Sequence, residues 1–216
     1  MDLLPSEILN EILLFLDRPS ILSASKVCRR WQSFALEQVV PIKSVDEFRE
    51  VCRRGDSLSL SRLKFRRDWV DEGLSGACQG GQLELAKFMI EKGATNWDYG
   101  LSAACGDGQL YLAKLMIEKG ATTLNLGLYA ACRGGHLEPA KLMIEKGASN
   151  WNGGLYGACR GGHLDLAELM IEKGAFDWND GLYGACRSGQ FDLANFMIGK
   201  GASSCCCGRS LEEHLS

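Results

Sequence analysis

Several features that would point to particular protein classes are missing from this sequence. It has no run of about 18 apolar residues, so we expect no membrane-spanning helix. Acidic residues (Asp2, Glu7 and Glu11) interrupt the apolar start and no basic stretch precedes it, which argues against a secretion signal. Lys and Arg (24) do not outnumber Asp and Glu (27), and the net charge of -3 provides no basic field for nucleic acid.

No arrangement of side chains typical of a hydrolase occurs outside a set of repeated positions. His136 and His163 are one repeat apart, roughly 10 Å in a stack of helices, which is too far for one metal ion. We therefore expect no catalytic residue, no metal and no cofactor, and the protein is predicted not to be an enzyme.

A 27-residue motif recurs five times. Each copy opens with Gly-Leu, has Ala-Cys three residues after that leucine, and carries Met-Ile shortly before Lys-Gly-Ala. A unit of this size cannot bury its apolar face alone, so the copies are predicted to stack into one solenoid. The copies begin at Gly73, Gly100, Gly127, Gly154 and Gly181.

Each copy is predicted to form two short helices. In the fourth copy the first helix is expected over Leu155 to Arg160, where apolar residues recur at helical spacing, and Gly161 follows as a break. The second helix is expected to end at Gly174, a typical left-handed cap. Pro139 is tolerated only in a first turn, so that helix starts at about His136 to Glu138.

The segment Gly154 to Ala175 resembles an ankyrin repeat, matching its helix-loop-helix part. The resemblance covers about 130 residues and implies an all-α, ankyrin-like solenoid that binds a protein. Ankyrin repeats have a period of about 33 residues, and the residues missing here fall where ankyrins place a β-hairpin finger. We therefore expect shortened, tight turns between the repeats.

Half of the ten cysteines occupy one position of the repeat. Stacked helices lie roughly 8 to 10 Å apart, whereas a disulfide needs Cα atoms within about 7 Å. These cysteines (Cys78, Cys105, Cys132, Cys159 and Cys186) are expected to be buried and reduced, as in a cytoplasmic protein. Cys205, Cys206 and Cys207 could form a lipidation or metal site, or an unstructured reduced tail.

The N-terminal segment has a different pattern. Pro5 suits the first position of a helix, and the apolar residues that follow recur at helical spacing, before a turn and two further predicted helices. About 40 residues offer too little core to be comfortably stable alone. The string Leu-Pro-Ser-Glu-Ile-Leu (4–9) with Val-Cys-Arg-Arg-Trp (27–31) closely resembles the F-box.

That resemblance implies a three-helix F-box that binds a Skp-family adaptor of a cullin-RING ubiquitin ligase. The alternative is an ordinary helical cap on the first repeat. The residues that the resemblance assigns to the box and its adaptor contact are Leu4, Pro5, Ile8, Ile12, Leu16, Ile21, Leu22, Val27, Cys28 and Trp31.

The segment between the box and the repeats is interpreted as a linker and a degenerate capping repeat, since Cys52 and Gly55 match Cys78 and Gly81. A plain linker helix is the alternative. The predicted organisation is therefore an F-box at 1–40, the linker and capping repeat at 41–72, five repeats at 73–207 and a tail at 208–216.

Positions that differ between the repeats are candidates for partner binding, because stacking does not dictate them. The third and seventh positions of each copy lie on one helix face, and in the last three copies they hold Tyr and Arg, which offer amphipathic area and carboxylate binding. A solvated face without a ligand is the alternative. The candidate partner-binding residues are Tyr129, Arg133, Tyr156, Arg160, Tyr183 and Arg187.

Trp97, Trp151 and Trp178, with Leu124 and Cys205 at the same position, are expected to pack in the turns between repeats, and stacking on a ligand is the alternative.

Together these resemblances imply a substrate-recognition adaptor of an SCF-type ubiquitin ligase that acts in the cytoplasm and binds an unidentified target protein. The alternative is a decoy or scaffold that holds the adaptor or a partner without delivering it. Short ankyrin-like arrays with an F-box also resemble proteins of large DNA viruses of protists, which would make the adaptor a host protein.

Overall fold

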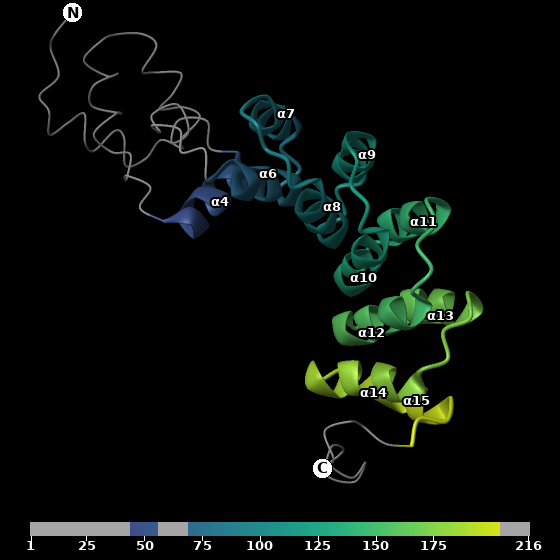
Figure 1. Cartoon of the computed structure of the whole chain (residues 1–216). Helices are drawn as coiled ribbons and strands as arrows, with labels where there is room; N and C mark the ends of the chain where they lie inside the picture. The colour runs from purple at the N-terminus through teal and green to yellow at the C-terminus, as the bar shows by residue number, and fades with distance from the viewer. Residues whose placement is uncertain (1–43, 56–68, 204–216) are drawn as a thin grey trace, which may run out of the picture. The chain divides into compact units, whose positions relative to one another are not determined.

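The computed structural model describes residues 44–55 and 69–203 of the chain. Within these ranges every regular element is an α-helix and none is a strand (Figure 1). The chain divides into two compact units, and the unit formed by residues 44–55 and 66–216 contains all the described helices. The predicted F-box lies outside the described residues.

The described helices follow a simple order. A single helix, α4 (Val45–Arg54), precedes five pairs of short helices. The pairs are α6 (Val70–Gln79) with α7 (Leu83–Glu91), α8 (Trp97–Gly106) with α9 (Leu110–Lys119), α10 (Leu124–Gly134) with α11 (Leu137–Glu145), α12 (Trp151–Gly161) with α13 (Leu164–Glu172), and α14 (Trp178–Arg187) with α15 (Phe191–Gly199).

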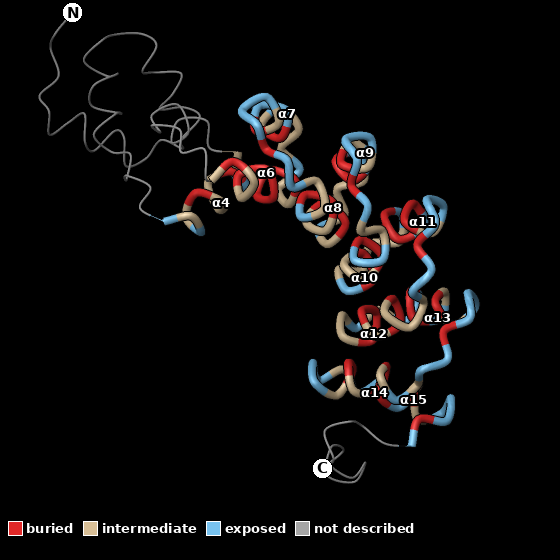
Figure 2. Tube along the Cα trace, in the orientation of Figure 1, coloured by how far each residue is buried: buried red, intermediate tan, exposed pale blue. Residues whose placement is uncertain are grey.

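The first helices of the pairs form one row, in which each packs against the next, and the second helices form a row beside it (Figure 1). Buried residues line the space between the two rows (Figure 2). The Leu of Gly-Leu, the Cys of Ala-Cys and the Met of Met-Ile supply this core. In the fourth repeat these are Leu155, Cys159 and Met170, all fully buried.

The glycine that opens each repeat lies close to the buried methionine of the second helix. A Cβ on Gly127 would lie 2.7 Å from the Sδ atom of Met143 in the second helix of the same repeat, and Gly100 and Gly181 meet Met116 and Met197 at 2.7 and 2.8 Å. A larger residue would therefore force the buried methionine of the same repeat to shift.

The first helices begin earlier than the sequence predicted. Instead of Leu155 to Arg160, α12 runs from Trp151 to Gly161, because the side chain of Asn150 accepts a hydrogen bond from the Gly153 backbone and caps the helix. Asn96 and Asp177 cap α8 and α14 in the same way. Trp97, Leu124, Trp151 and Trp178 are thus the first residues of helices, half-buried, and do not lie in the turns as expected.

The turns between the repeats are short and contain no strand, as predicted. Gly174 follows α13 with a φ of 108°, a conformation that favours glycine, and its backbone N–H donates to Ile171. The second helix of the third repeat begins at Leu137, which places Pro139 in its first turn.

A row of Asn and Asp side chains ties each repeat to the next. The Oδ1 atom of Asn152 accepts hydrogen bonds from the backbone N–H groups of Phe176 (2.9 Å) and Asp177 (3.1 Å), at the turn before α14. These bonds satisfy backbone donors that no other part of the turn reaches. The equivalent acceptors are Asp71 for Thr95 and Asn96, Asp98 for Thr122 and Thr123, Asn125 for Ser149 and Asn150, and Asn179 for Ser203.

Helix α4 has the features of a first helix of the repeat. It packs against α6, its Cys52 is fully buried, and Gly55 ends it in the left-handed conformation. The remainder of the predicted capping repeat falls in residues 56–68, outside the described residues, so the full capping repeat stays a prediction.

We predict that the inter-repeat hydrogen bonds of Asn152 can be removed selectively. Asn152→Ala deletes the acceptor for two backbone donors and should lower the free energy of unfolding by about 1 kcal/mol, or the melting temperature by about 2–4 °C. Asn152→Asp keeps the acceptor, as Asp71 and Asp98 do in other repeats, and should match or exceed the wild type. Equal melting temperatures for the Ala and Asp variants in thermal denaturation would contradict this role.

A second prediction concerns pH. The backbone N–H groups of Thr123 and Thr122 hold the pKa of Asp98 below its usual range. A lowered carboxyl pKa stabilises the fold above about pH 4, the value in the unfolded chain, and this contribution is lost as the pH falls through the folded value. The melting-temperature difference between wild type and Asp98→Asn should therefore shrink from pH 6 to pH 3, because Asn does not titrate. A constant difference over this range would contradict the assignment.

Candidate partner-binding face

Three tyrosines from consecutive first helices form a stacked row. The ring centroids of Tyr129 and Tyr156 are 6.1 Å apart with planes inclined by 13°, and those of Tyr156 and Tyr183 are 6.3 Å apart at 17°. All three side chains are half-buried. The structure thus brings together the three tyrosines that the sequence singled out.

Glycines in the next helix make room for these rings. A Cβ on Gly157 would lie 2.8 Å from the carbonyl oxygen of Tyr129 and 3.0 Å from its Cδ2 atom, and a Cβ on Gly184 would lie 2.9 Å from the same two atoms of Tyr156. The residue that follows the third position of a repeat is therefore constrained by the residue at the third position of the preceding repeat.

The sequence of the other repeats agrees with this constraint. Where the preceding repeat carries the small Ser75 or Ser102, the next one has Ala103 or Ala130 in place of glycine. We infer that the tyrosine and glycine positions act as a pair across the stack. Sequence reasoning compared residues within one repeat and missed this coupling between neighbouring repeats.

The three arginines lie one turn beyond the tyrosines on the same helices. Arg160 donates from Nη1 to the hydroxyl oxygen of Tyr129 in the preceding repeat (3.2 Å), and Arg187 donates to Tyr183 in its own helix (3.2 Å). The hydrogen bond that Arg160 donates to the Tyr129 hydroxyl raises the pKa of Arg160. We call these three tyrosines and three arginines the Tyr-Arg face.

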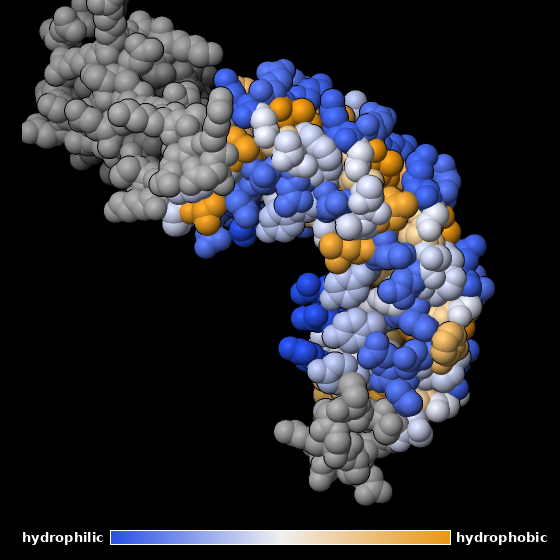
Figure 3. Space-filling model, in the orientation of Figure 1, coloured by the Kyte–Doolittle hydropathy of each residue, from blue (hydrophilic) through white to orange (hydrophobic). Residues whose placement is uncertain are grey.

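Strongly hydrophilic side chains project from the stack in a row at α10, α12 and α14 (Figure 3). Arg133 and Arg187 are exposed and Arg160 is half-buried.

One further position belongs to the same helix face and was not predicted. It immediately precedes the opening glycine, three residues before the tyrosine position, so helical spacing places both on one side. Its residues vary in chemistry and all are at least partly exposed, which makes them candidates for specificity. They are Glu72, Tyr99, Leu126, Gly153 and Asp180.

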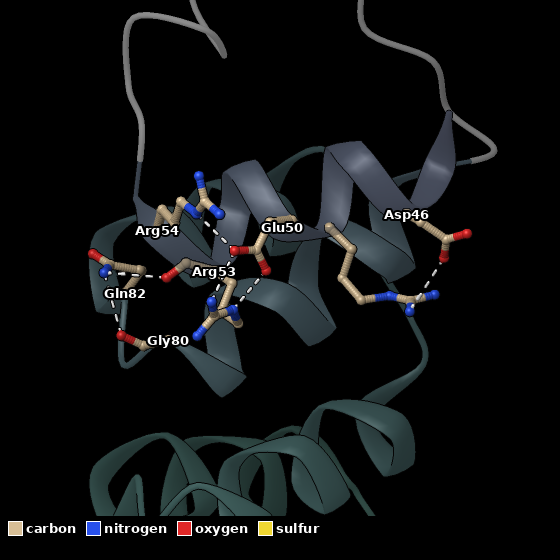
Figure 4. A network of polar contacts seen from close by, with 7 residues as sticks. Asp46, Glu50, Arg53, Arg54, Gly80 and Gln82 are labelled. Atoms are coloured by element: carbon tan, nitrogen blue, oxygen red, sulfur yellow. Dashed lines mark hydrogen bonds and ion pairs between the residues drawn. The ribbon is translucent and has the colours of Figure 1, made fainter. Parts of the chain in front are cut away.

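The start of the stack is built differently. Arg49 of α4 pairs with Glu72 of α6 (2.6 Å), and its guanidinium carbon lies 6.0 Å from the ring centroid of Tyr99. Arg53 and Arg54 converge on Glu50 (Figure 4). The hydrogen bonds that Arg53 and Arg54 donate lower the pKa of the Glu50 carboxyl to about 2, and the bond from Arg53 contributes most.

Gln82 connects α4 to the following pair of helices. Its amide nitrogen lies 3.2 Å from the carbonyl oxygen of Gly80 and 3.5 Å from that of Arg53 (Figure 4). The side chain also covers Gly55. His136 and His163 occupy the equivalent position, directly before α11 and α13, and cover Gly108 and Gly135. Both histidines therefore have a packing role at the start of a helix.

The repeated cysteines are free and lie in the core. Cys78, Cys105, Cys132 and Cys159 are buried, and Cys186 is partly buried. Burial raises the pKa of Cys132 to about 12, and the other three fully buried thiols of the repeats reach the same value. At neutral pH these groups are thiols and not nucleophiles. Within residues 44–55 and 69–203, no cluster of His, Cys, Asp and Glu could hold a metal ion.

The ten residues assigned to the adaptor contact, from Leu4 to Trp31, lie outside the described residues, as do Cys205, Cys206 and Cys207. None of the described helices is long and apolar enough to cross a membrane.

The pairing of Tyr129 with Gly157 predicts a specific rescue. Gly157→Ala should destabilise the fold by roughly 1–3 kcal/mol through overpacking, although Ala in a helix is otherwise favoured by about 1 kcal/mol. Adding Tyr129→Ser recreates the combination of Ser102 and Ala130 and should restore part of the loss. Gly199→Ala is the control, because a Cβ there meets nothing within 4 Å. Purely additive melting-temperature shifts in the double variant would exclude the pairing.

Comparison with known proteins finds a similarity for each part of the chain. A family model described as the F-box domain matches residues 1–43. Among solved structures, the crystal structure of the human ASB11 ankyrin repeat domain is similar with a TM-score of 0.54 and 22% sequence identity, covering 76% of this chain and 88% of that one.

None of the curated proteins matches the chain, and the likeness to viral proteins stays a prediction. The chain thus joins a segment that matches the F-box domain to a helical stack with the fold of an ankyrin repeat domain.

Proposed function

We propose that this protein is a substrate-recognition adaptor of an SCF-type cullin-RING ubiquitin ligase. The observation that carries the proposal is the joining of an F-box domain match at residues 1–43 to a stack of ankyrin fold in one chain. An F-box implies a Skp-family partner, and ankyrin repeats imply a protein target. The chain therefore has one part for each of two partners.

In this proposal the F-box provides the contact with the Skp-family adaptor. The apolar residues that the F-box resemblance assigns from Leu4 to Trp31 would bury the small core of the box and cover apolar surface on the adaptor. The segments proposed for the two functions are 1–40 for the box and 73–207 for the repeats, with 41–72 as a connecting capping repeat.

The repeats hold the target, and the Tyr-Arg face is the proposed contact. The face combines stacked aromatic rings with charged guanidinium groups at an accessible surface, and both residue types are favoured in protein interfaces. The mechanism is recruitment: the target is held near the ligase, and other subunits transfer ubiquitin. The buried, free cysteines support the cytoplasmic location that the sequence predicts.

We predict that the double variant Leu4→Ala with Pro5→Ala loses the Skp-family adaptor. Truncation of an interface hot spot costs on the order of 2 kcal/mol or more, about thirtyfold in affinity. The measurement is a pull-down of recombinant adaptor with the full chain. The triple variant Arg133→Ala, Arg160→Ala and Arg187→Ala is the control and should bind the adaptor like the wild type.

Unchanged adaptor binding by the Leu4 and Pro5 variant would contradict the proposed contact. A reconstituted ubiquitylation assay with a captured target then tests delivery. Ubiquitylation that requires both the box and the Tyr-Arg face supports a substrate adaptor, whereas binding of both partners without any ubiquitylation would instead identify a decoy or scaffold.

A further inference from the structure

The arginines of the Tyr-Arg face differ from the other described arginines in their partners. In α4, Arg49 pairs with Glu72 (2.6 Å), Arg53 with Glu50 (2.7 Å) and Arg54 with Glu50 (2.6 Å). Within residues 44–55 and 69–203, Arg133, Arg160 and Arg187 form no ion pair with a carboxylate. Two of them bond only to tyrosine hydroxyls, which leaves further guanidinium N–H donors available.

The positions that carry these donors repeat along the stack, although Arg160 bonds to Tyr129 of the preceding repeat and Arg187 bonds to Tyr183 of its own helix. The arginines occupy one position of three stacked helices whose tyrosine rings are 6.1 and 6.3 Å apart. A ligand that follows the tyrosine row and pairs with one arginine of each repeat would present a negative group about every 6 Å.

An extended peptide has this spacing. It rises about 3.2–3.4 Å per residue, somewhat less when twisted, and alternate side chains share one side, so carboxylates at alternate positions are roughly 6.5 Å apart. Carboxylates at every fourth residue of an α-helix are also about 6 Å apart, but they rotate by about 40° per step. The tyrosine planes turn by only 13° and 17° per step, which favours the extended peptide.

We propose that the Tyr-Arg face binds an extended acidic segment of the target protein in which Asp or Glu occupies alternate positions, one carboxylate for each of Arg133, Arg160 and Arg187. The planar guanidinium can donate two parallel hydrogen bonds to a carboxylate, and the tyrosine row supplies flat apolar area beneath the peptide backbone. This inference rests on the proposed function, because it names the chemistry of the target at the same face.

The charge of the chain favours a peptide over nucleic acid. The net charge of -3 offers no long-range field for a phosphate backbone. Asp180, which directly precedes the glycine that opens the last repeat, and Asp177, which caps the same helix, add negative charge near the end of the face. A short peptide can place its carboxylates at the arginines alone. A polyanion carries negative charge along its whole length and would also lie near these aspartates.

The test compares two labelled peptides of identical composition by fluorescence anisotropy with the full chain. In one peptide three glutamates alternate with serines, and in the other the same glutamates are consecutive. The alternating peptide should bind about threefold to tenfold more tightly, because it aligns more carboxylates with the arginines at up to about 1 kcal/mol for each exposed pair. Its affinity should fall as salt is added.

The Arg133→Ala, Arg160→Ala and Arg187→Ala variant should lose most of this binding. The matched control replaces Arg49, Arg53 and Arg54 by Ala, which changes the net charge equally but removes only arginines that already have carboxylate partners. That control should retain binding, with circular dichroism verifying that both variants are folded.

Three results would overturn the proposal. The first is equal affinity for the two peptides, and the second is an equal loss of peptide binding in the two triple variants. The third is that oligothymidine binds more tightly than the alternating peptide and that the Arg133, Arg160 and Arg187 variant loses this oligothymidine binding. The last result would identify a nucleic-acid face. Adaptor binding measured in the same preparations separates this inference from the proposed function, because a chain that binds the adaptor but neither peptide fails only here.

Discussion

The close approach of consecutive first helices is the constraint on which the rest of the structure depends. Glycines allow it: Gly157 and Gly161 of α12 meet the backbone carbonyl groups of Tyr129 and Arg133 in α10. Because the helices approach so closely, the tyrosines of neighbouring repeats stack at 6.1 and 6.3 Å. The same approach buries the Leu of every repeat and the Cys of the first four repeats in a continuous core.

Two kinds of side chain hold this arrangement in register. Asn and Asp residues such as Asn152 accept backbone N–H groups from the turn that starts the next repeat. Gln and His residues at the start of the second helices cover glycines of the preceding repeat, as Gln82 covers Gly55. Because the turns between the repeats are too short for β-hairpin fingers, these side chains supply the contacts between neighbouring turns. A rigid stack presents its variable residues at fixed spacing, which is what a recognition surface requires.

Much of the fold could be predicted from the sequence because the repeat is regular. The position of Pro139 and the glycines that end the second helices set helix boundaries, and the third and seventh positions were correctly placed on one face. The starts of the first helices were wrong, because Asn150 and Asp177 were not recognised as caps. The inter-repeat hydrogen bonds were missed because donor and acceptor are 24 or 25 residues apart, although Asp or Asn two residues before each opening glycine was a visible signal.

The candidate site could be predicted only in part for a similar reason. Alignment of the repeats identifies variable residues, but whether a variable arginine already has a carboxylate partner depends on the packed structure. Arg49 and Arg160 are indistinguishable as residue types, yet one is paired with Glu72 and the other bonds to Tyr129. The adaptor contact rests on the F-box match to residues 1–43 and on the predicted residues within it.

We propose that one chain connects a Skp-family adaptor and a target through separate surfaces. The most direct measurement is sequential binding on a sensor: immobilised adaptor, then the full chain, then a target protein that carries the alternating acidic segment. The account predicts three successive layers, with the target binding the adaptor-bound chain as tightly as it binds the free chain. Target binding that occurs only when the adaptor is absent would contradict the account.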